Sequence, residues 1–171
     1  WGPDSNWVWT PQNLDKARAN GFELGTRIGP FYDITYSLDY TYTNGEEETQ
    51  YVTRRASYTP KNLFKGDVTY WAPFGLTARA TVRYVGDRVY YGTDQTTTEP
   101  QDTLDPYVTL DMRLEQRFFE NWLFSLEGNN LFNKSYDTYF GSFTDPSTWQ
   151  TSSAKYPGSG RSGFFQVAYE F

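Results

Sequence analysis

The sequence contains neither cysteine nor histidine. Without cysteine there is no disulfide framework and no thiolate metal site. Without histidine there is no triad of the Ser-His-Asp type, no common zinc site and no side chain whose ordinary pKa lies near neutrality. These absences exclude most hydrolase and metalloenzyme classes. We therefore expect no catalytic residues, no metal-binding residues and no enzymatic activity.

Long hydrophobic runs and clusters of basic residues are also missing. The mean hydropathy is −0.73, although 20% of the residues are aromatic. A transmembrane helix needs about 20 successive apolar residues, and the sequence has no such run. The 15 Lys and Arg residues are outnumbered by 21 Asp and Glu, which gives a net charge of −6. Because counterion release requires clustered cations, nucleic acid is not expected as a partner.

The length of 171 residues suits one domain or part of a larger one. The chain begins at Trp1 with no visible signal peptide, so we expect a processed, cloned or partial product.

Alternation with a period of two residues is the strongest pattern, and it is typical of strands with two unlike faces. From Ile34 to Tyr42 every second residue is apolar or aromatic, with Thr, Ser or Asp between. The same alternation recurs, more weakly in the last two cases, over Leu76–Tyr84, Val108–Leu114, Trp122–Leu126, Phe165–Phe171, Phe22–Ile28 and Phe64–Tyr70. The pattern predicts seven strands between Ala17 and Phe171, with little helix.

The connections between these strands alternate in length. We expect tight turns at Gly29–Tyr32, Ala72–Gly75 and Phe118–Asn121. Between them lie long polar segments, over Asn44–Lys61, Arg88–Asp105 and Ser135–Arg161. Loops of this length are usually functional. Short turns on one rim and long loops on the other are typical of an outer-membrane barrel.

A soluble β-sandwich also alternates apolar and polar residues. In that case the aromatic loops would suit a carbohydrate-binding module. Three features favour a membrane barrel instead: strands of about 10 residues or more, aromatic residues near the strand ends, and long and short connections that stay on opposite rims.

The number of strands separates two kinds of barrel. A simple bacterial barrel closes with an even number of strands, and open edges in lipid would leave backbone groups unpaired. Either Trp1–Pro11 supplies an eighth strand, giving a self-contained barrel that acts as an anchor or adhesin, or the chain is part of a larger barrel. Only a short fragment near Trp7–Thr10 looks like a strand between Pro3 and Pro11, so the partial barrel is favoured.

Four segments resemble one known family. The segment Ala17–Leu24 is similar to an "A…GFEL" strand entry, Gly128–Tyr136 to an "NLF(D/N)K.Y" signature, and Tyr156–Arg161 to a "YPGPGR" segment before the last strand. The chain then stops on Phe171, behind an alternating aromatic strand. Taken together and in this order, the segments resemble the carboxyl-terminal third of a TonB-dependent outer-membrane receptor.

The resemblance implies an all-β fold, the C-terminal portion of a 22-stranded antiparallel transmembrane barrel, in the bacterial outer membrane. Residues 1–171 would form that portion, with the plug domain and the TonB box absent. The implied function is active import of a metal chelate, a siderophore or cobalamin, with no cofactor beyond the transported ligand. The implied partners are the lipid bilayer, the TonB complex through the missing N-terminal region, the remaining barrel and plug, and the barrel-assembly machinery. The assembly signal would be Phe165, Val167, Tyr169 and Phe171.

With a periplasmic C-terminus, the three long connections are extracellular loops. Their aromatic faces and cations suit planar, anionic or chelated ligands, through stacking and charge-assisted hydrogen bonds. We expect ligand-binding residues at Arg88, Tyr90, Tyr91, Tyr139, Phe140 and Trp149. The same loops also carry Arg54, Arg55, Phe143, Lys155 and Tyr156. The alternative is that each of these side chains only packs the loops over the rim.

Charged residues between the apolar positions are expected to face the barrel lumen and to pair across neighbouring strands. This set comprises Glu23, Arg27, Asp39, Arg79, Arg83, Asp111, Arg113, Glu115 and Glu127. It forms either a network that fixes the plug or a solvated polar face. The acidic run Glu46–Glu48 is expected to be a solvated loop segment.

Overall fold

The computed structural model describes residues 2–3, 8–10, 16–92 and 94–171. All regular structure in these residues is β-strand, and none of their segments forms a helix long and apolar enough to cross a membrane. The strands are β1 (Gly2–Pro3), β2 (Trp9–Thr10), β3 (Lys16–Phe31), β4 (Ile34–Glu48), β5 (Thr53–Arg55), β6 (Asn62–Trp71), β7 (Leu76–Val85), β8 (Arg88–Tyr90), β9 (Asp102–Leu104), β10 (Tyr107–Phe118), β11 (Trp122–Asn129), β12 (Asp137–Thr144), β13 (Thr151–Pro157) and β14 (Ser162–Tyr169).

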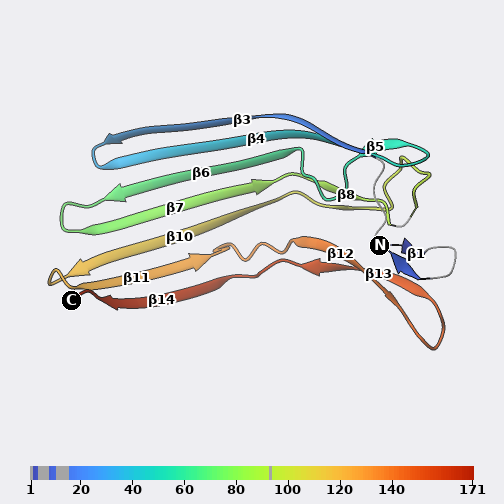
Figure 1. Ribbon diagram of the computed structural model, residues 1–171. Coiled ribbons are helices and arrows are strands. Elements are labelled where there is room, and N and C mark those ends of the chain that lie inside the picture. The colour runs from blue at the N-terminus through green and yellow to red at the C-terminus, as the bar shows by residue number, and fades with distance from the viewer. Residues whose placement is uncertain (1, 4–7, 11–15, 93) are drawn as a thin grey trace.

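Seven long strands form one antiparallel sheet in the order β14-β11-β10-β7-β6-β4-β3, which confirms the predicted number. Figure 1 shows the seven strands side by side. When the short strands of the loops are left out, each long strand pairs with the long strand before and after it in the sequence. In the described residues β3 and β14 are the two edges, so the sheet is a partial barrel that is not closed. Among the described residues β1 pairs with β2 in a separate two-stranded sheet, and neither of them pairs with a strand of the large sheet. Trp1, Trp7 and Pro11 lie outside the described residues.

The two ends of the sheet differ as the sequence predicts. At the short-turn rim, Asp33, Pro73 and Glu120 lie in tight turns between neighbouring strands. The turn that the sequence predicts at Gly29–Tyr32 lies further along the chain in the structure. β3 continues through Phe31, and the turn falls at Tyr32–Asp33, where both residues have positive φ (49° and 63°). The register shifts between Ile28 and Phe31, so Gly29 and Pro30 interrupt the pairing without ending the strand.

At the long-loop rim the connections are not structureless. They contain the short strand β5, which pairs with β4, and the hairpins β8–β9 and β12–β13 (Figure 1). β4 itself extends through Glu46, Glu47 and Glu48, so this acidic run belongs to a strand. The predicted solvated loop is wrong for Glu47, which is only 6% exposed.

In a soluble domain the apolar face of a sheet is buried and the polar face is exposed. In this sheet the apolar face is exposed and the polar face is the more buried one. The apolar face carries exposed side chains such as Phe165 (68%) and Leu126 (53%). Exposed residues of the same face are Phe22, Leu24, Ile28, Tyr36, Val68, Val82, Met112, Val167 and Tyr169. The polar face carries buried hydroxyls, with Thr69 at 5% and Thr81 at 7%. A sheet with apolar side chains outward and polar side chains inward is typical of a barrel that faces lipid.

Two asparagines close the base of the last long loop. The Asn130 amide donates to the carbonyls of Lys134 (2.9 Å) and Ser159 (3.1 Å), and its oxygen accepts from Lys134 N (2.8 Å). Asn133 Oδ1 accepts from Arg161 N (3.0 Å). Both asparagines have positive φ (48° and 51°), a conformation that Asn tolerates better than most residues. This asparagine bridge gives the "NLF.K.Y"-like segment a structural role, because it joins the end of β11 to the start of β14.

Candidate functional site

Three rows of polar side chains cross the polar face. Register places Thr35 opposite Thr69, Asp67 opposite Thr81, and Lys65 opposite Arg83. Hydrogen bonds link cross-strand partners within two of these rows, from Arg79 Nε to Thr69 Oγ1 (3.1 Å) and from Thr81 Oγ1 to Asp67 Oδ1 (2.6 Å).

Cross-strand ion pairs continue the rows toward β11. Arg83 lies 2.8 Å from Asp111 and Arg113 lies 3.2 Å from Glu127, while Arg113 also lies 2.7 Å from Glu115 of its own strand. The predicted pairing of opposite charges across neighbouring strands is therefore confirmed for Arg83 with Asp111 and for Arg113 with Glu127.

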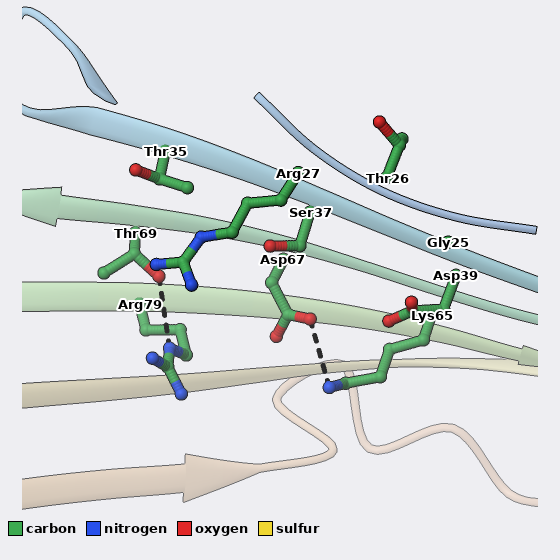
Figure 2. Close-up of a pocket in the computed structure, with 10 residues that line it drawn as sticks. All are labelled: Gly25, Thr26, Arg27, Thr35, Ser37, Asp39, Lys65, Asp67, Thr69 and Arg79. Atoms are coloured by element: carbon green, nitrogen blue, oxygen red, sulfur yellow. Dashed lines mark hydrogen bonds and ion pairs between the residues drawn. The ribbon is translucent and has the colours of Figure 1, made fainter. Parts of the chain in front are cut away.

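A groove of about 470 Å³ lies on the polar face over β3, β4, β6 and β7. Its ten lining residues include Arg27, Asp39, Lys65, Asp67 and Arg79. Figure 2 shows these side chains on one side of the strands, with Lys65 paired to Asp67 at 3.1 Å. The groove presents both signs of charge and several hydroxyls, so it suits a polar partner surface rather than an apolar ligand.

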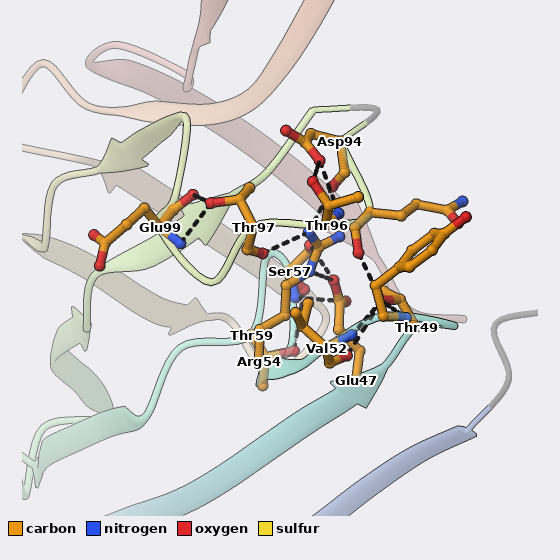
Figure 3. A network of polar contacts seen from close by, with 12 residues as sticks. Glu47, Thr49, Val52, Arg54, Ser57, Thr59, Asp94, Thr96, Thr97 and Glu99 are labelled. Atoms are coloured by element: carbon orange, nitrogen blue, oxygen red, sulfur yellow. Dashed lines mark hydrogen bonds and ion pairs between the residues drawn. The ribbon is translucent and has the colours of Figure 1, made fainter.

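A buried ion pair fastens the middle loop to the β4–β5 hairpin (Figure 3). Arg54 Nε donates to Glu47 Oε1 at 2.8 Å, and the two side chains are only 6% and 9% exposed. The other end of Arg54 donates to the carbonyls of Asp94 (2.6 Å) and Thr97 (3.2 Å). Its guanidinium also lies 4.1 Å from the ring centroid of Tyr91. We call this set the Arg54 clamp.

A second cluster joins aromatic rings from all three long loops. Tyr58 stacks on Tyr139 with ring centroids 5.0 Å apart, and it lies 5.6 Å from Tyr90. Tyr90 in turn stacks on Phe140 at 5.0 Å. Tyr156 lies 6.3 Å from Tyr139 at the edge of the cluster. Residues from β8, from β12–β13 and from the loop after β5 therefore form one aromatic cluster above the sheet.

Two cations hold this aromatic cluster in place. Arg88 donates to the carbonyls of Asp137 (2.8 Å) and Thr138 (3.2 Å), and its guanidinium lies 5.6 Å from the Tyr107 ring. Lys155 donates to the carbonyl of Thr103 (3.0 Å), and its ammonium lies 5.4 Å from the Phe140 ring. Their side chains therefore join the middle loop to the last loop.

The structure separates the six predicted ligand-binding residues into distinct environments. Tyr90, Tyr139 and Phe140 come together in the aromatic cluster, and Arg88 lies beside them. Tyr91 belongs instead to the Arg54 clamp. Trp149 lies on a separate turn, where its backbone N–H donates to the carbonyl of Asp145 (2.8 Å).

Burial divides the same six residues in a different way. Arg88, Tyr91 and Phe140 are buried, whereas Tyr139 and Trp149 are 55% and 81% exposed. Tyr90 is half-buried, so the six side chains range from buried to exposed. The side chain of Phe143 lies outside the described part of the chain.

Sequence reasoning missed Tyr58, the ring that joins the cluster. Its backbone has a positive φ of 57°, which turns the loop after β5 toward β8. Tyr58 also donates its hydroxyl to Phe140 O at 3.4 Å, across a sequence separation of 82 residues. The available signal was an aromatic residue in each long loop, but the sequence does not show which of them meet.

Local environment shifts the pKa values of several groups in these loops, among them Tyr58, Tyr91 and Asp87. Burial, with Tyr139 alongside, raises the pKa of the Tyr58 phenol to about 12. Burial also raises the pKa of Tyr91, and the nearby Arg54 charge opposes that rise. Arg55 donates a hydrogen bond to Asp87 and lowers the pKa of that carboxyl group. The two tyrosines therefore stay neutral at ordinary pH and act as rings and hydrogen-bond donors.

An outward apolar face, an inward polar face, a rim of tight turns and a rim of packed loops define a transmembrane β-barrel protein. The family model described as "TonB dependent receptor-like, beta-barrel" matches residues 1–131. The chain therefore belongs to the TonB-dependent receptor β-barrel family, which places it in the outer membrane of a Gram-negative bacterium.

Curated relatives support this assignment. The chain is 29% identical over 174 aligned positions to the vitamin B12 transporter of Vibrio vulnificus, covering 100% of this chain and 25% of the relative. It is 28% identical over 138 positions to a ferric-pyoverdine receptor of a Pseudomonas species, covering 75% of this chain and 16% of the relative. The chain thus spans a quarter or less of the length of these relatives.

Solved structures share the fold. The closed form of the ferric-catecholate import receptor Fiu of E. coli superposes with a TM-score of 0.66 and 21% identity, covering 98% of this chain and 22% of that one. The copper transporter OprC superposes with a TM-score of 0.70 and 19% identity, covering 91% and 24%. At these identities the likeness establishes the fold alone.

Proposed function

We propose that the chain is the C-terminal part of the barrel of an active-transport receptor, and that the whole receptor imports a metal chelate of the siderophore or cobalamin kind. The family supports this class of protein, and the two curated relatives are named for vitamin B12 and for ferric pyoverdine. In this proposal the plug domain and the TonB-contacting region belong to the remainder of the receptor. The protein acts as a transporter and catalyses no reaction.

The observation that carries the proposal is the aromatic cluster at the long-loop rim, directly beyond a polar channel wall. Tyr139 and Tyr156 are each 55% exposed at its edge, and Trp149 is 81% exposed on a separate turn between β12 and β13. Exposed rings on a rigidly packed base can stack on a planar or chelated ligand at little cost in side-chain entropy. The mixed charges of the groove lined by Arg27, Asp39 and Lys65 then offer the plug a polar surface to pair with.

Tryptophan fluorescence of the full-length receptor in detergent tests the proposal. A panel of cyanocobalamin, a ferric catecholate and a ferric hydroxamate is titrated separately, and one of them should quench the fluorescence saturably. Tyr139→Ala should weaken that binding by about tenfold, the size expected for one exposed stacking ring of 1–1.5 kcal/mol. Phe132→Ala is the matched control, because this aromatic is 76% exposed but belongs to the turn after β11.

Failure of all three chelates to bind, with the receptor folded, would refute chelate import. Equal loss of binding in the Phe132 and Tyr139 variants would refute the assignment of the aromatic cluster as the contact surface.

A further inference from the structure

A second groove lies on the opposite, lipid-facing side of the sheet. Its volume is about 560 Å³, within the range of about 300–1,000 Å³ for sites that bind small molecules. Its walls are apolar side chains of β10 and β11, namely Met112, Leu114 and Leu126, with Leu131 from the following turn. Figure 1 shows β10, β11 and β14, the strands that carry it, as adjacent ribbons.

Two glycines lie at the centre of this hollow. Gly128 of β11 and Gly163 of β14 are direct cross-strand partners, and Met112 of β10 is the next partner in the same row. The Leu131 side chain covers Gly128, since a Cβ there would lie 2.7 Å from Leu131 Cδ2. The space beside Gly163 is open, and it adjoins the row that carries Phe165 and Leu126.

An arginine marks the outer end of the groove. Arg161 lines it, directly before β14 and therefore at the long-loop rim. Its backbone is fixed because its N–H donates to Asn133 Oδ1 at 3.0 Å. Within the described residues its guanidinium forms no ion pair, and the residue is exposed. An unpaired arginine at the level of the membrane surface favours an anionic headgroup, since it can bind phosphate through two parallel hydrogen bonds.

A neighbouring groove provides an internal comparison. Over β4, β6 and β7 the same face has a hollow of about 440 Å³ around Gly66, Tyr36 and Val68. None of its lining residues is lysine or arginine. Both grooves can accept an acyl chain, but only the one that ends at Arg161 combines an apolar trough with a cation.

We propose that the Gly128–Gly163 groove is a lipid-binding site, which holds one acyl chain of a phosphate-bearing lipid of the outer leaflet while Arg161 pairs with the phosphate. The site does not depend on chelate import, because it requires only the outer-membrane location. Bound lipid would cover the β11–β14 junction at this pair of glycines.

Native mass spectrometry of the full-length receptor tests the site. The receptor is released from detergent in the presence of the phosphorylated diglucosamine lipid of the outer leaflet (lipid A) or of the same lipid with its phosphates removed. The wild type should retain the phosphorylated lipid at least about fivefold better than the dephosphorylated one, the size expected for one arginine at an anionic surface. Arg161→Gln should abolish this preference, and Arg161→Lys should keep most of it.

Filling the groove gives an independent test. A Cβ at Gly163 would meet only Glu127 O, at 3.6 Å, which is an ordinary contact. The side chain of Gly163→Leu would therefore extend into the groove and should lower lipid retention by about fivefold or more. Gly66→Leu places the same side chain in the groove without a cation and should leave the phosphate preference unchanged. Heat-modifiable migration in gels confirms that each variant is folded. Equal retention of both lipids by the wild type, or an unchanged preference in Arg161→Gln, would overturn the proposal.

Discussion

The Arg54 clamp makes a quantitative prediction about loop stability. In Arg54→Met the apolar stem is kept, while the ion pair with Glu47, the two bonds to the carbonyls of Asp94 and Thr97, and the contact with Tyr91 are lost. Removing one partner of a buried ion pair costs about 3–5 kcal/mol. Glu47 keeps its hydrogen bonds from Ser57 (3.1 and 3.3 Å), so we expect the lower end of that range.

Hydrogen exchange followed by mass spectrometry measures this loss locally. A cost of about 3 kcal/mol corresponds to exchange more than about 100-fold faster in the segments 45–59 and 94–104, because local opening sets their exchange rates. The strands β10 and β11 should exchange at the wild-type rate. Adding Glu47→Gln to Arg54→Met should recover part of the loss, since the remaining carboxylate would no longer be buried without its cation.

The matched control is an exposed ion pair on the other side of β4, between β3 and β4. Lys16 lies 3.8 Å from Glu48, and the two side chains are 62% and 42% exposed. Exposed pairs contribute little, so Lys16→Ala should change exchange by no more than about twofold. If Arg54→Met also stayed within about twofold, the clamp would not hold the middle loop, and the burial argument would be refuted.

Three further predictions concern the loops. Asn130→Ala removes three hydrogen bonds of about 1 kcal/mol each and should speed exchange of the Lys134 amide by about 100-fold, whereas Asn133→Ala removes one and should give less than about tenfold. The Tyr58 phenol has a pKa of about 12 in the fold and about 10 when unfolded. Its contribution to the stability of the aromatic cluster is therefore complete below pH about 10 and should disappear as pH rises toward 12. Tyr58→Phe should remove the corresponding step from an ultraviolet tyrosinate titration. Asp87, whose pKa Arg55 lowers, contributes stability above the ordinary aspartate pKa of about 3.9 and loses it as pH falls through its lowered value. Asp87→Asn should remove this contribution, so the loss of loop protection on acidification, measured relative to the intrinsic exchange rate, should be smaller than in the wild type.

Most of the sheet could be predicted from the sequence because each strand carries its own two-residue signal. The side chains of Ile34–Tyr42 alternate between lipid and lumen, and this local pleat does not depend on distant parts of the chain. All seven long strands were found on this basis. The turn near Gly29 was misplaced because a Gly-Pro pair signals either a turn or a register irregularity, and here Gly29 and Pro30 lie within the strand.

The site was less predictable because its contacts join loops that are far apart in the sequence. Arg54 meets Asp94 across 40 residues, and Tyr58 meets Phe140 across 82. No local pattern distinguishes an aromatic residue that packs between loops, such as Phe140, from one that stays exposed, such as Trp149. The sequence indicates which long loops carry aromatic and cationic residues, but which of these side chains are buried and which are exposed required the fold. Whether the exposed ones bind a ligand stays a prediction, as does the assembly role of Phe165, Val167, Tyr169 and Phe171.

The asparagine bridge has an evolutionary consequence. Asn130 and Asn133 bind main-chain atoms of Lys134, Ser159 and Arg161 at the foot of the last loop, below the β12–β13 hairpin. Because these bonds reach backbone atoms, the foot stays closed whatever side chains or length the hairpin above it has. The β12–β13 hairpin can therefore differ in sequence and length between homologous receptors, or be grafted from one to another, without disturbing the pairing of β11 with β14.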